Sequence, residues 1–144
     1  MALTFTGLRA DPPRLNNAMD VIANLEADVS LEVNGEVIYD EVSFPVAELA
    51  CALTRWSQAD AAGRSDFEFD SMSAEERGLV WIRRVDGGWR LGSIDQEHPE
   101  PRVFSAGEID EFVRKYVEDL NEQVETTFGP RTLALLIEAL RTDQ

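Results

Sequence analysis

The spacing of apolar and polar residues predicts a strand followed by a helix at the start of the chain. Residues 3–9 alternate as a half-buried β-strand does. Asp-Pro-Pro at 11–13 suits the cap and first positions of a helix, and apolar residues then recur at helical spacing. The pattern favours a helix over 12–24, and a strand from about 21 is the competing interpretation. The apolar positions of this helix are Leu15, Ala18, Met19, Ile22 and Leu25.

The following segment has the pattern of a β-hairpin. Apolar and polar residues alternate over 27–33, a second strand is expected over 36–42, and Asn34-Gly35 lies between the two runs. Asn-Gly is a strong hairpin signal because a type I′ turn needs positive φ at both central residues. A two-residue turn places apolar residues of the second strand on both faces of the hairpin. Either both faces are partly covered or a β-bulge corrects the register.

A second helix and a short strand are predicted in the middle of the chain. The helix opens at Pro45, whose fixed φ suits a first helical position, and its apolar stripe continues to Trp56. Residues 66–70, with the sequence DFEFD, form a strand with both Phe side chains on one face and the acids on the other. The segment 71–78 is expected to be a turn.

A second hairpin follows. Strands at 79–85 and 89–95 flank Asp-Gly-Gly at 86–88. If this loop has three residues, Trp81 and Trp89 lie on one face of the hairpin. Packing in the core is the simplest interpretation of the tryptophans, whose buried indole N–H groups then need acceptors. An exposed aromatic pair would instead indicate a binding hot spot.

The strongest helical pattern lies near the end of the chain. Ser105 and Glu108 have the spacing of a capping box, and Gly129-Pro130 is a stop signal. A short last helix is expected over 131–141. The apolar positions of the two helices are Ile109, Phe112, Val113, Tyr116, Val117, Leu120, Val124 and Phe128, then Leu133, Leu136, Ile137 and Leu140.

These elements predict a single α+β domain over residues 1–144. The two hairpins indicate an antiparallel sheet of five or six strands, with the helices packed mainly on one face and a long C-terminal helix followed by a short one. The chain has 144 residues, of which 44% are hydrophobic, so it is long enough and apolar enough to bury one core.

The charge balance restricts the partners that suit this domain. The chain has 28 acidic and 13 basic residues, which gives a formal net charge of −15. Such a field repels nucleic acids and anionic membranes and attracts cationic partners. Solubility alone is the alternative explanation of the charge. We therefore expect a basic protein partner, with no nucleic acid and no membrane.

The sequence offers few residues for catalytic or metal chemistry. Cys51 is the only cysteine and His98 the only histidine, so neither an internal disulfide nor a Cys/His zinc site is expected. His98 lies in a Pro-rich stretch that suits a solvated loop. The first residues contain no long apolar run, so we predict neither a signal peptide nor a membrane span, and a cytoplasmic location. No cofactor, no metal and no enzymatic activity are predicted.

The first candidate partner-binding surface is the late half of the long helix. After Lys115 the balance of charges stops: Glu118, Glu122 and Glu125 line one outward face, with Asp119 beside them, and these acids are expected to be unpaired locally. A helix C-terminus carries partial negative charge and disfavours carboxylates. A solvated face is the ordinary interpretation, and a surface kept acidic for a basic partner is the functional one. The early half is balanced by Asp110–Arg114, Glu111–Lys115 and Arg114–Glu118 at i,i+4 spacing.

The second candidate surface is the acidic row of the short strand. Asp66, Glu68 and Asp70 lie about 7 Å apart at strand rise, similar to the spacing of phosphates on a nucleic acid. Mimicry of DNA is one interpretation. The competing interpretation is that Arg84 and Arg90 on a neighbouring strand neutralise the row. A third acidic group, at the first hairpin, consists of Glu36, Asp40 and Glu41.

The layout also resembles a known class of proteins. An Asn-Gly hairpin leads into FPVAELACALTRW, then come FEFD, a hairpin ending GGWRLGSIDQ and a long capped helix. Over residues 20–128 this resembles small acidic single-domain proteins of bacterial toxin–immunity loci, in particular a group with a similar Pro-x-x-Glu-Leu-Ala…Trp helix. The resemblance implies an inhibitor that binds a cognate toxin by shape and charge. It assigns no functional residues.

We therefore expect a non-catalytic, immunity-type inhibitor of a basic toxin domain, for example a nuclease. The second hypothesis is a secretion-chaperone-like module that binds an extended client as a homodimer. The third is an enzyme that uses carboxylates alone, which would need a cleft with two facing acids. Both a monomer and a homodimer are compatible with the sequence.

Overall fold

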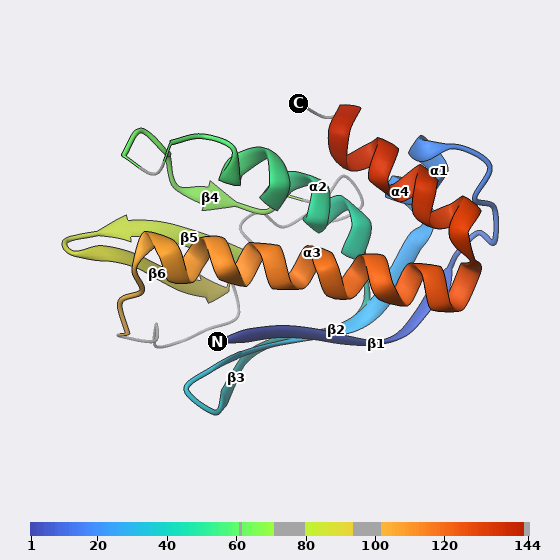
Figure 1. Ribbon diagram of the computed structural model, residues 1–144. Coiled ribbons are helices and arrows are strands. Elements are labelled where there is room, and N and C mark those ends of the chain that lie inside the picture. The colour runs from blue at the N-terminus through green and yellow to red at the C-terminus, as the bar shows by residue number, and fades with distance from the viewer. Residues whose placement is uncertain (61, 71–79, 94–101, 143–144) are drawn as a thin grey trace.

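The structure is a computed structural model that describes residues 1–60, 62–70, 80–93 and 102–142 (Figure 1). It confirms the α+β class. The elements, in chain order, are β1 (Ala2–Ala10), α1 (Ala18–Asn24), β2 (Leu25–Val33), β3 (Glu36–Phe44), α2 (Val46–Ser57), β4 (Phe67–Glu68), β5 (Val80–Val85), β6 (Gly88–Ser93), α3 (Ala106–Phe128) and α4 (Pro130–Thr142).

Among the described residues the strands form two antiparallel sheets of three strands each, in the orders β1–β2–β3 and β4–β5–β6. The single sheet of five or six strands that the sequence predicted is therefore wrong. The sheets meet where the Ser93 hydroxyl of β6 donates a hydrogen bond of 2.9 Å to the Ile38 carbonyl of β3. Trp89 of β6 instead exchanges backbone hydrogen bonds with Phe104, in the segment before α3. Because this hydrogen bond comes from a side chain and does not belong to a backbone ladder, the two sheets remain separate.

Helix α1 is shorter than the helix predicted over 12–24. It begins immediately after Asn17, whose side chain accepts a hydrogen bond of 2.9 Å from the backbone N–H of Asp20. This local cap satisfies the first turn, so the Pro-Pro segment lies outside the helix. The competing strand from about 21 is also wrong, because β2 begins at Leu25. Met19, predicted to face inward, is 64% exposed.

The first hairpin has the predicted turn and contains a β-bulge. Asn34 and Gly35 have φ values of 53° and 78°, as a type I′ turn requires. A strict continuation of this turn would pair Leu31 with Ile38, but Leu31 faces Tyr39. The shift lets Ile38 and Tyr39 both be buried although they are adjacent in sequence. The bulge is thus the device that corrects the register.

The second hairpin has a two-residue turn at 86–87, and Gly88 already belongs to β6. This one-residue difference places Trp89 opposite Arg84, on the other face of the hairpin from Trp81. The predicted shared face of the two tryptophans is therefore wrong. Both are buried, at 3% and 8% exposure, which confirms core packing over an exposed aromatic pair.

Strand β4 covers only the first part of the predicted strand 66–70. Phe67 and Glu68 pair with β5, and the backbone N–H of Phe69 donates a hydrogen bond of 2.9 Å to Val80. Phe67 and Phe69 are buried, so the predicted apolar face is confirmed. The turn predicted at 71–78 and the loop histidine lie outside the described residues.

Helix α3 begins and ends where the sequence predicted. The Ser105 hydroxyl accepts a hydrogen bond from the backbone N–H of Glu108, and the Glu108 carboxylate accepts one from the backbone N–H of Ser105. The helix ends at Gly129, which has a φ of 96°. In α4, Leu136 and Leu140 are buried as predicted and Leu133 is partly buried. Ile137 is only half-buried, and Ala139 is fully buried instead, because α4 packs on α1 and α2 as well as on α3 (Figure 1).

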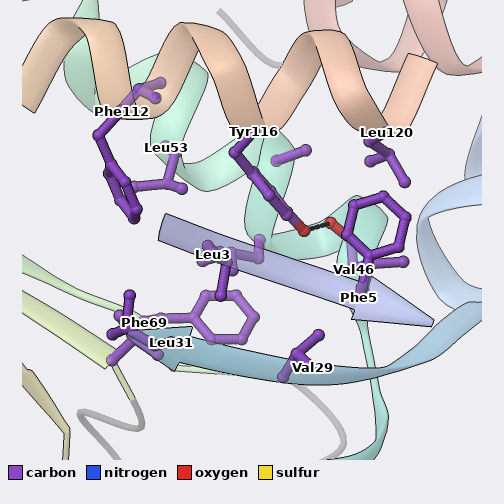
Figure 2. Close-up of a cluster of buried hydrophobic side chains, with 14 of the residues drawn as sticks. Leu3, Phe5, Val29, Leu31, Val46, Leu53, Phe69, Phe112, Tyr116 and Leu120 are labelled. Atoms are coloured by element: carbon purple, nitrogen blue, oxygen red, sulfur yellow. Dashed lines mark hydrogen bonds between the residues drawn. The ribbon is translucent and has the colours of Figure 1, made fainter. Parts of the chain in front are cut away.

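The core lies between the first sheet and the helices α2 and α3 (Figure 2). Tyr116 of α3 is 1% exposed, and its ring meets the edge of Phe5 with the ring centroids 6.0 Å apart. Its hydroxyl donates a hydrogen bond of 2.6 Å to the Val46 carbonyl of α2. Burial raises the pKa of this phenol, so it stays a protonated donor. One side chain thus links β1, α2 and α3.

We predict that Tyr116→Phe lowers the free energy of unfolding by about 1 kcal/mol, because it removes one buried hydrogen bond and keeps the ring. Tyr116→Ala should lower it by about 3–5 kcal/mol, since the ring is lost as well. Urea unfolding followed by tryptophan fluorescence measures both values. A Phe variant as stable as the original protein would show that the hydrogen bond adds nothing to the packing of the ring.

Candidate functional site

Two of the four candidate acids on α3 are paired with basic side chains one turn earlier. Arg114 forms ion pairs with Glu111 and Glu118, and the Lys115 ammonium lies 3.7 Å from the Asp119 carboxylate. The Arg114–Glu118 pair that the sequence predicted is therefore confirmed. The expectation that the carboxylates after Lys115 lack a local partner is wrong for Asp119. Helical geometry explains the result, because residues three and four positions apart are neighbours on the helix surface.

The negative charge of α3 is concentrated at its C-terminal end. Glu122 and Glu125 are exposed, and neither forms an ion pair within the described part of the chain. The last turn of α3 has no basic residue. A hollow of about 330 Å³ lies at this end of the helix. It is lined by Asp119, Glu122, Gln123, Thr126 and Thr127. The helix carbonyl groups add to the negative potential there.

The early half of α3 is tied to the end of α2 by a buried arginine. Asp110, which the sequence paired with Arg114, accepts a hydrogen bond of 2.9 Å from Arg64. The Arg64 side chain is 3% exposed and also donates to the backbone carbonyls of Ser57 and Ala59, at 2.9 Å each. These carbonyls lie at the C-terminus of α2, where a cation is favoured. Arg64 is therefore a structural tie between two helices.

The same arginine covers an aromatic ring. Its guanidinium lies 4.6 Å from the ring centroid of Trp56. The Trp56 indole N–H donates a hydrogen bond of 2.7 Å to the Ser65 carbonyl, which is the acceptor that a packed indole needs. The loop that follows α2 is thus held by Arg64 and Trp56 together.

The acids of the β4 row each have a different surrounding. Asp66 accepts a hydrogen bond of 2.8 Å from the backbone N–H of Arg84, and the Glu68 carboxylate lies 3.5 Å from the Arg83 guanidinium. The sequence assigned the neutralising role to Arg84 and Arg90. The strand pairing places Arg90 on the same face as Glu68 and Arg84 on the opposite face. Arg83, which the sequence analysis did not select, lies on the face of Glu68, diagonally across the ladder.

Glu68 and Asp70 line a hollow of about 430 Å³ that we call the α2–β4 hollow. Helix α2 contributes a third carboxylate, Glu48, which the sequence analysis did not select. The sequence contains a pattern that could have identified Glu48. One flank of α2 carries, at helical spacing, Glu48, Cys51, Ala52 and Arg55. Helix α1 and Phe69 complete the lining.

The outward face of the first sheet carries further acids around Arg9. Its guanidinium forms ion pairs with Glu26 at 3.0 Å and Asp28 at 3.1 Å and donates to the Ser43 hydroxyl at 2.8 Å. The backbone N–H of Ser43 also donates to the Asp28 carboxylate. This backbone hydrogen bond, followed by the bond from Arg9, lowers the pKa of Asp28. The cluster therefore fastens the ends of all three strands.

The structure places the two candidate surfaces in separate hollows. Asp119 and Glu122 line one of them, and Glu68 and Asp70 line another. Glu118 lines a third, between α2 and α3. No described hollow has lining residues from both α3 and β4. The acids of α3 and of β4 therefore offer two separate contact points for a partner.

Carboxylates are the dominant chemical groups of these surfaces. No group of three or more His, Cys, Asp or Glu residues within the described ranges has the arrangement of a metal site. None of the helices described here combines the length and apolar character needed to cross a lipid bilayer. Exposed carboxylates beside apolar side chains bind cationic groups by charge and contact.

Comparison with known proteins identifies a family without an assigned function. Residues 1–126 match a family described as a domain of unknown function (DUF7878), and the chain belongs to that family. We found no similar curated protein and no similar solved structure.

We predict that Arg64→Ala lowers the free energy of unfolding by about 2 kcal/mol. The substitution removes the donor to the half-exposed Asp110 carboxylate and to the two backbone carbonyls at the end of α2. Arg83→Ala is the matched control. Arg83 also lies over a tryptophan, at 4.1 Å from the ring of Trp81, but its ion pair is about half exposed on both sides. This control should cost less than about 1 kcal/mol. Equal losses in urea unfolding would contradict the structural role of Arg64.

We also predict that Asp28 makes the stability depend on pH in the acid range. Its folded pKa is lowered below the ordinary value of 3.8, so its contribution is fully present above that value. The contribution is lost as the pH falls through the folded pKa. The stability difference between the original protein and Asp28→Asn should therefore be constant above about pH 5 and shrink below it.

Urea unfolding at several values between neutral and strongly acidic pH measures this difference. Asp40→Asn removes one carboxylate from the same sheet and controls for the change in net charge. A difference that stays constant down to the lowest pH would rule out a stabilising role of the Asp28 carboxylate.

Proposed function

We propose that this protein is a non-catalytic acidic binding protein that inhibits a basic toxin domain, and that the C-terminal end of α3 is its main contact. One observation carries the proposal. Glu122 and Glu125 are exposed on the last turns of α3 and form no ion pair with any other described residue. They are the acids that remain available to a partner on this helix.

The position of these acids is unfavourable for the isolated protein. A carboxylate near a helix C-terminus costs about 0.3–1 kcal/mol through the helix dipole. Glu118 and Asp119 offset part of this cost through Arg114 and Lys115, but Glu122 has no such pair among the described side chains. A cationic partner surface would remove the unfavourable term on binding. The centre of the proposed contact is therefore 122–125.

The net charge supports the choice of a basic partner. A formal charge of −15 on 144 residues accelerates the encounter with a positively charged surface and repels polyanions. Nucleases and other proteins that bind phosphate have such surfaces, and an acidic protein bound there would exclude the substrate. The resemblance to immunity-type proteins supports the same class of partner and a cytoplasmic site of action.

The first step of the test identifies the partner. The tagged protein is used to capture proteins from its native host, with washes at low and high salt, and the bound proteins are identified by mass spectrometry. We expect a stoichiometric basic protein that is released by salt, because ion pairs at a solvated surface are screened. Recovery of the protein alone would contradict the proposal.

The second step locates the contact. We predict that Glu122→Lys with Glu125→Lys lowers the association rate of the captured partner roughly tenfold at low salt and flattens its salt dependence. Glu32→Lys with Asp40→Lys is the matched control, because it changes the net charge equally on exposed positions of the first sheet. Surface plasmon resonance measures the rates. If both double variants lower the association rate equally, the rate depends on the net charge of the protein and not on the acids of α3.

A further inference from the structure

We propose that the protein forms a homodimer in which β1 pairs antiparallel with β1 of a second copy, around a twofold axis at Thr4. The three-stranded first sheets of the two copies then join into one continuous sheet. This inference goes beyond the proposed function, because it concerns another element and another partner.

Strand β1 is an edge strand whose outer side is unpaired in the described part of the chain. In the order β1–β2–β3 it has a neighbour on one side only, and residues 2–6 pair with β2 in an uninterrupted register. The backbone of residues 2–6 bonds to no other described segment. In Figure 1, β1 lies at the front of the first sheet, and no labelled element passes before it. Such an edge presents N–H and C=O groups that can bond to another strand.

The two edges of the first sheet differ in their protection against pairing. The other edge, β3, carries the exposed acids Glu36, Asp40 and Glu41, and its register with β2 shifts twice. Charges and bulges are common devices that prevent sheet edges from joining. Residues 2–6 have neither, because the irregularity of β1 follows this run and the sequence has no acid before Asp11. The edge that is open to pairing is therefore β1.

The absence of charge decides which partner suits this edge. A basic partner would find no carboxylate on β1. A second copy has the same formal net charge of −15, so self-association is opposed wherever the surface is acidic. At residues 2–6 two copies can pair through their backbones without placing one carboxylate opposite another. The neutral edge of an acidic protein thus favours a second copy of the same chain.

The side chains of the strand are complementary to themselves. In a twofold antiparallel pair centred on Thr4, the two Thr4 side chains face each other, which is a favourable cross-strand pair. Leu3 of one copy then faces Phe5 of the other, and both lie on the buried inner face, at 5% and 6% exposure. On the outer face, Ala2 lies opposite Thr6. Apolar residues therefore meet apolar residues, as a symmetric interface requires.

A hollow beside the start of β1 extends this neutral region. Its volume is about 520 Å³, and its lining includes Met1 and Phe112 of α3. The two basic and two acidic side chains of the lining have formal charges that cancel. In the twofold pair, the far end of the copy's β1 runs past this hollow. The surroundings of this end of the edge are therefore neutral as well.

Sedimentation velocity over a range of protein concentrations measures the dimer. We expect a monomer–dimer equilibrium that shifts toward the dimer at high salt, because salt screens the repulsion between two acidic chains. Thr4→Glu should weaken dimerisation at least about tenfold, since it places two carboxylates opposite each other at the axis. Val42→Glu is the matched control, because it adds the same charge at an exposed position of β3 and should have a much smaller effect. Thermal unfolding verifies that both variants are folded.

Disulfide trapping tests the register of the pair. Thr4→Cys places two thiols on opposed residues, whose Cα atoms lie about 4.5–5.5 Å apart in an antiparallel pair, within the reach of a disulfide. With oxidised glutathione as the oxidant, this variant should form a covalent dimer. Thr6→Cys is the control, because the two Thr6 positions lie on opposite sides of the axis, about 13 Å apart along the strands. Cys51 is buried and is present in both variants.

The outcomes separate this inference from the proposed function. A monomer at every concentration and salt would overturn the dimer and leave the α3 contact standing. A dimer that Val42→Glu weakens as much as Thr4→Glu does, or that Thr6→Cys traps as readily as Thr4→Cys, would overturn the pairing through β1. The two proposals fail independently, because high salt strengthens this dimer and releases the basic partner of α3.

Discussion

The hydrogen bond from the Tyr116 hydroxyl to the Val46 carbonyl is the contact on which the arrangement of the helices depends. It lies in the core, where an unpaired hydroxyl would cost about 1–3 kcal/mol. It therefore holds the middle of α3 against the first turn of α2. Because Tyr116 and Leu120 face inward, the helical period turns Glu118, Glu122 and their neighbours outward. The burial of Tyr116 and Leu120 thus orients the acidic face of α3, and the hydrogen bond joins α3 to the helix that contributes to the α2–β4 hollow.

The basic residues of this chain are largely used within it. Arg64 ties α3 to α2, Arg9 fastens the first sheet, Arg83 faces β4, and Arg114 with Lys115 neutralises the middle of α3. Since the sequence has more than twice as many acids as bases, this internal pairing leaves an excess of carboxylates on the surface. Internal stability and an acidic exterior are therefore two results of the same distribution of charge, and the exterior is what a cationic partner meets.

Long-range packing decided the features that the sequence did not predict. The second hairpin turns at 86–87 because Gly88 approaches the Phe104 carbonyl so closely that a Cβ atom would lie 2.3 Å from it, and Phe104 is distant in sequence. Asp110 pairs with Arg64 and not with its helical neighbour Arg114, because the end of α2 lies beside α3. The split of the strands into two sheets has the same origin, since Trp89 bonds to the segment before α3.

The sequence by itself determined the α+β class, the turn at Asn34, the capping box at Ser105 and the end of α3 at Gly129. Each of these depends on residues within a few positions of one another, whose backbone angles and side-chain hydrogen bonds act locally. It also identified the exposed acids of α3, because helical period alone turns them outward. Only the tertiary structure decided that Asp110 pairs with Arg64 and that Glu48 and Glu68 share one hollow. Those facts depend on contacts between elements far apart in the chain, which local pattern does not contain.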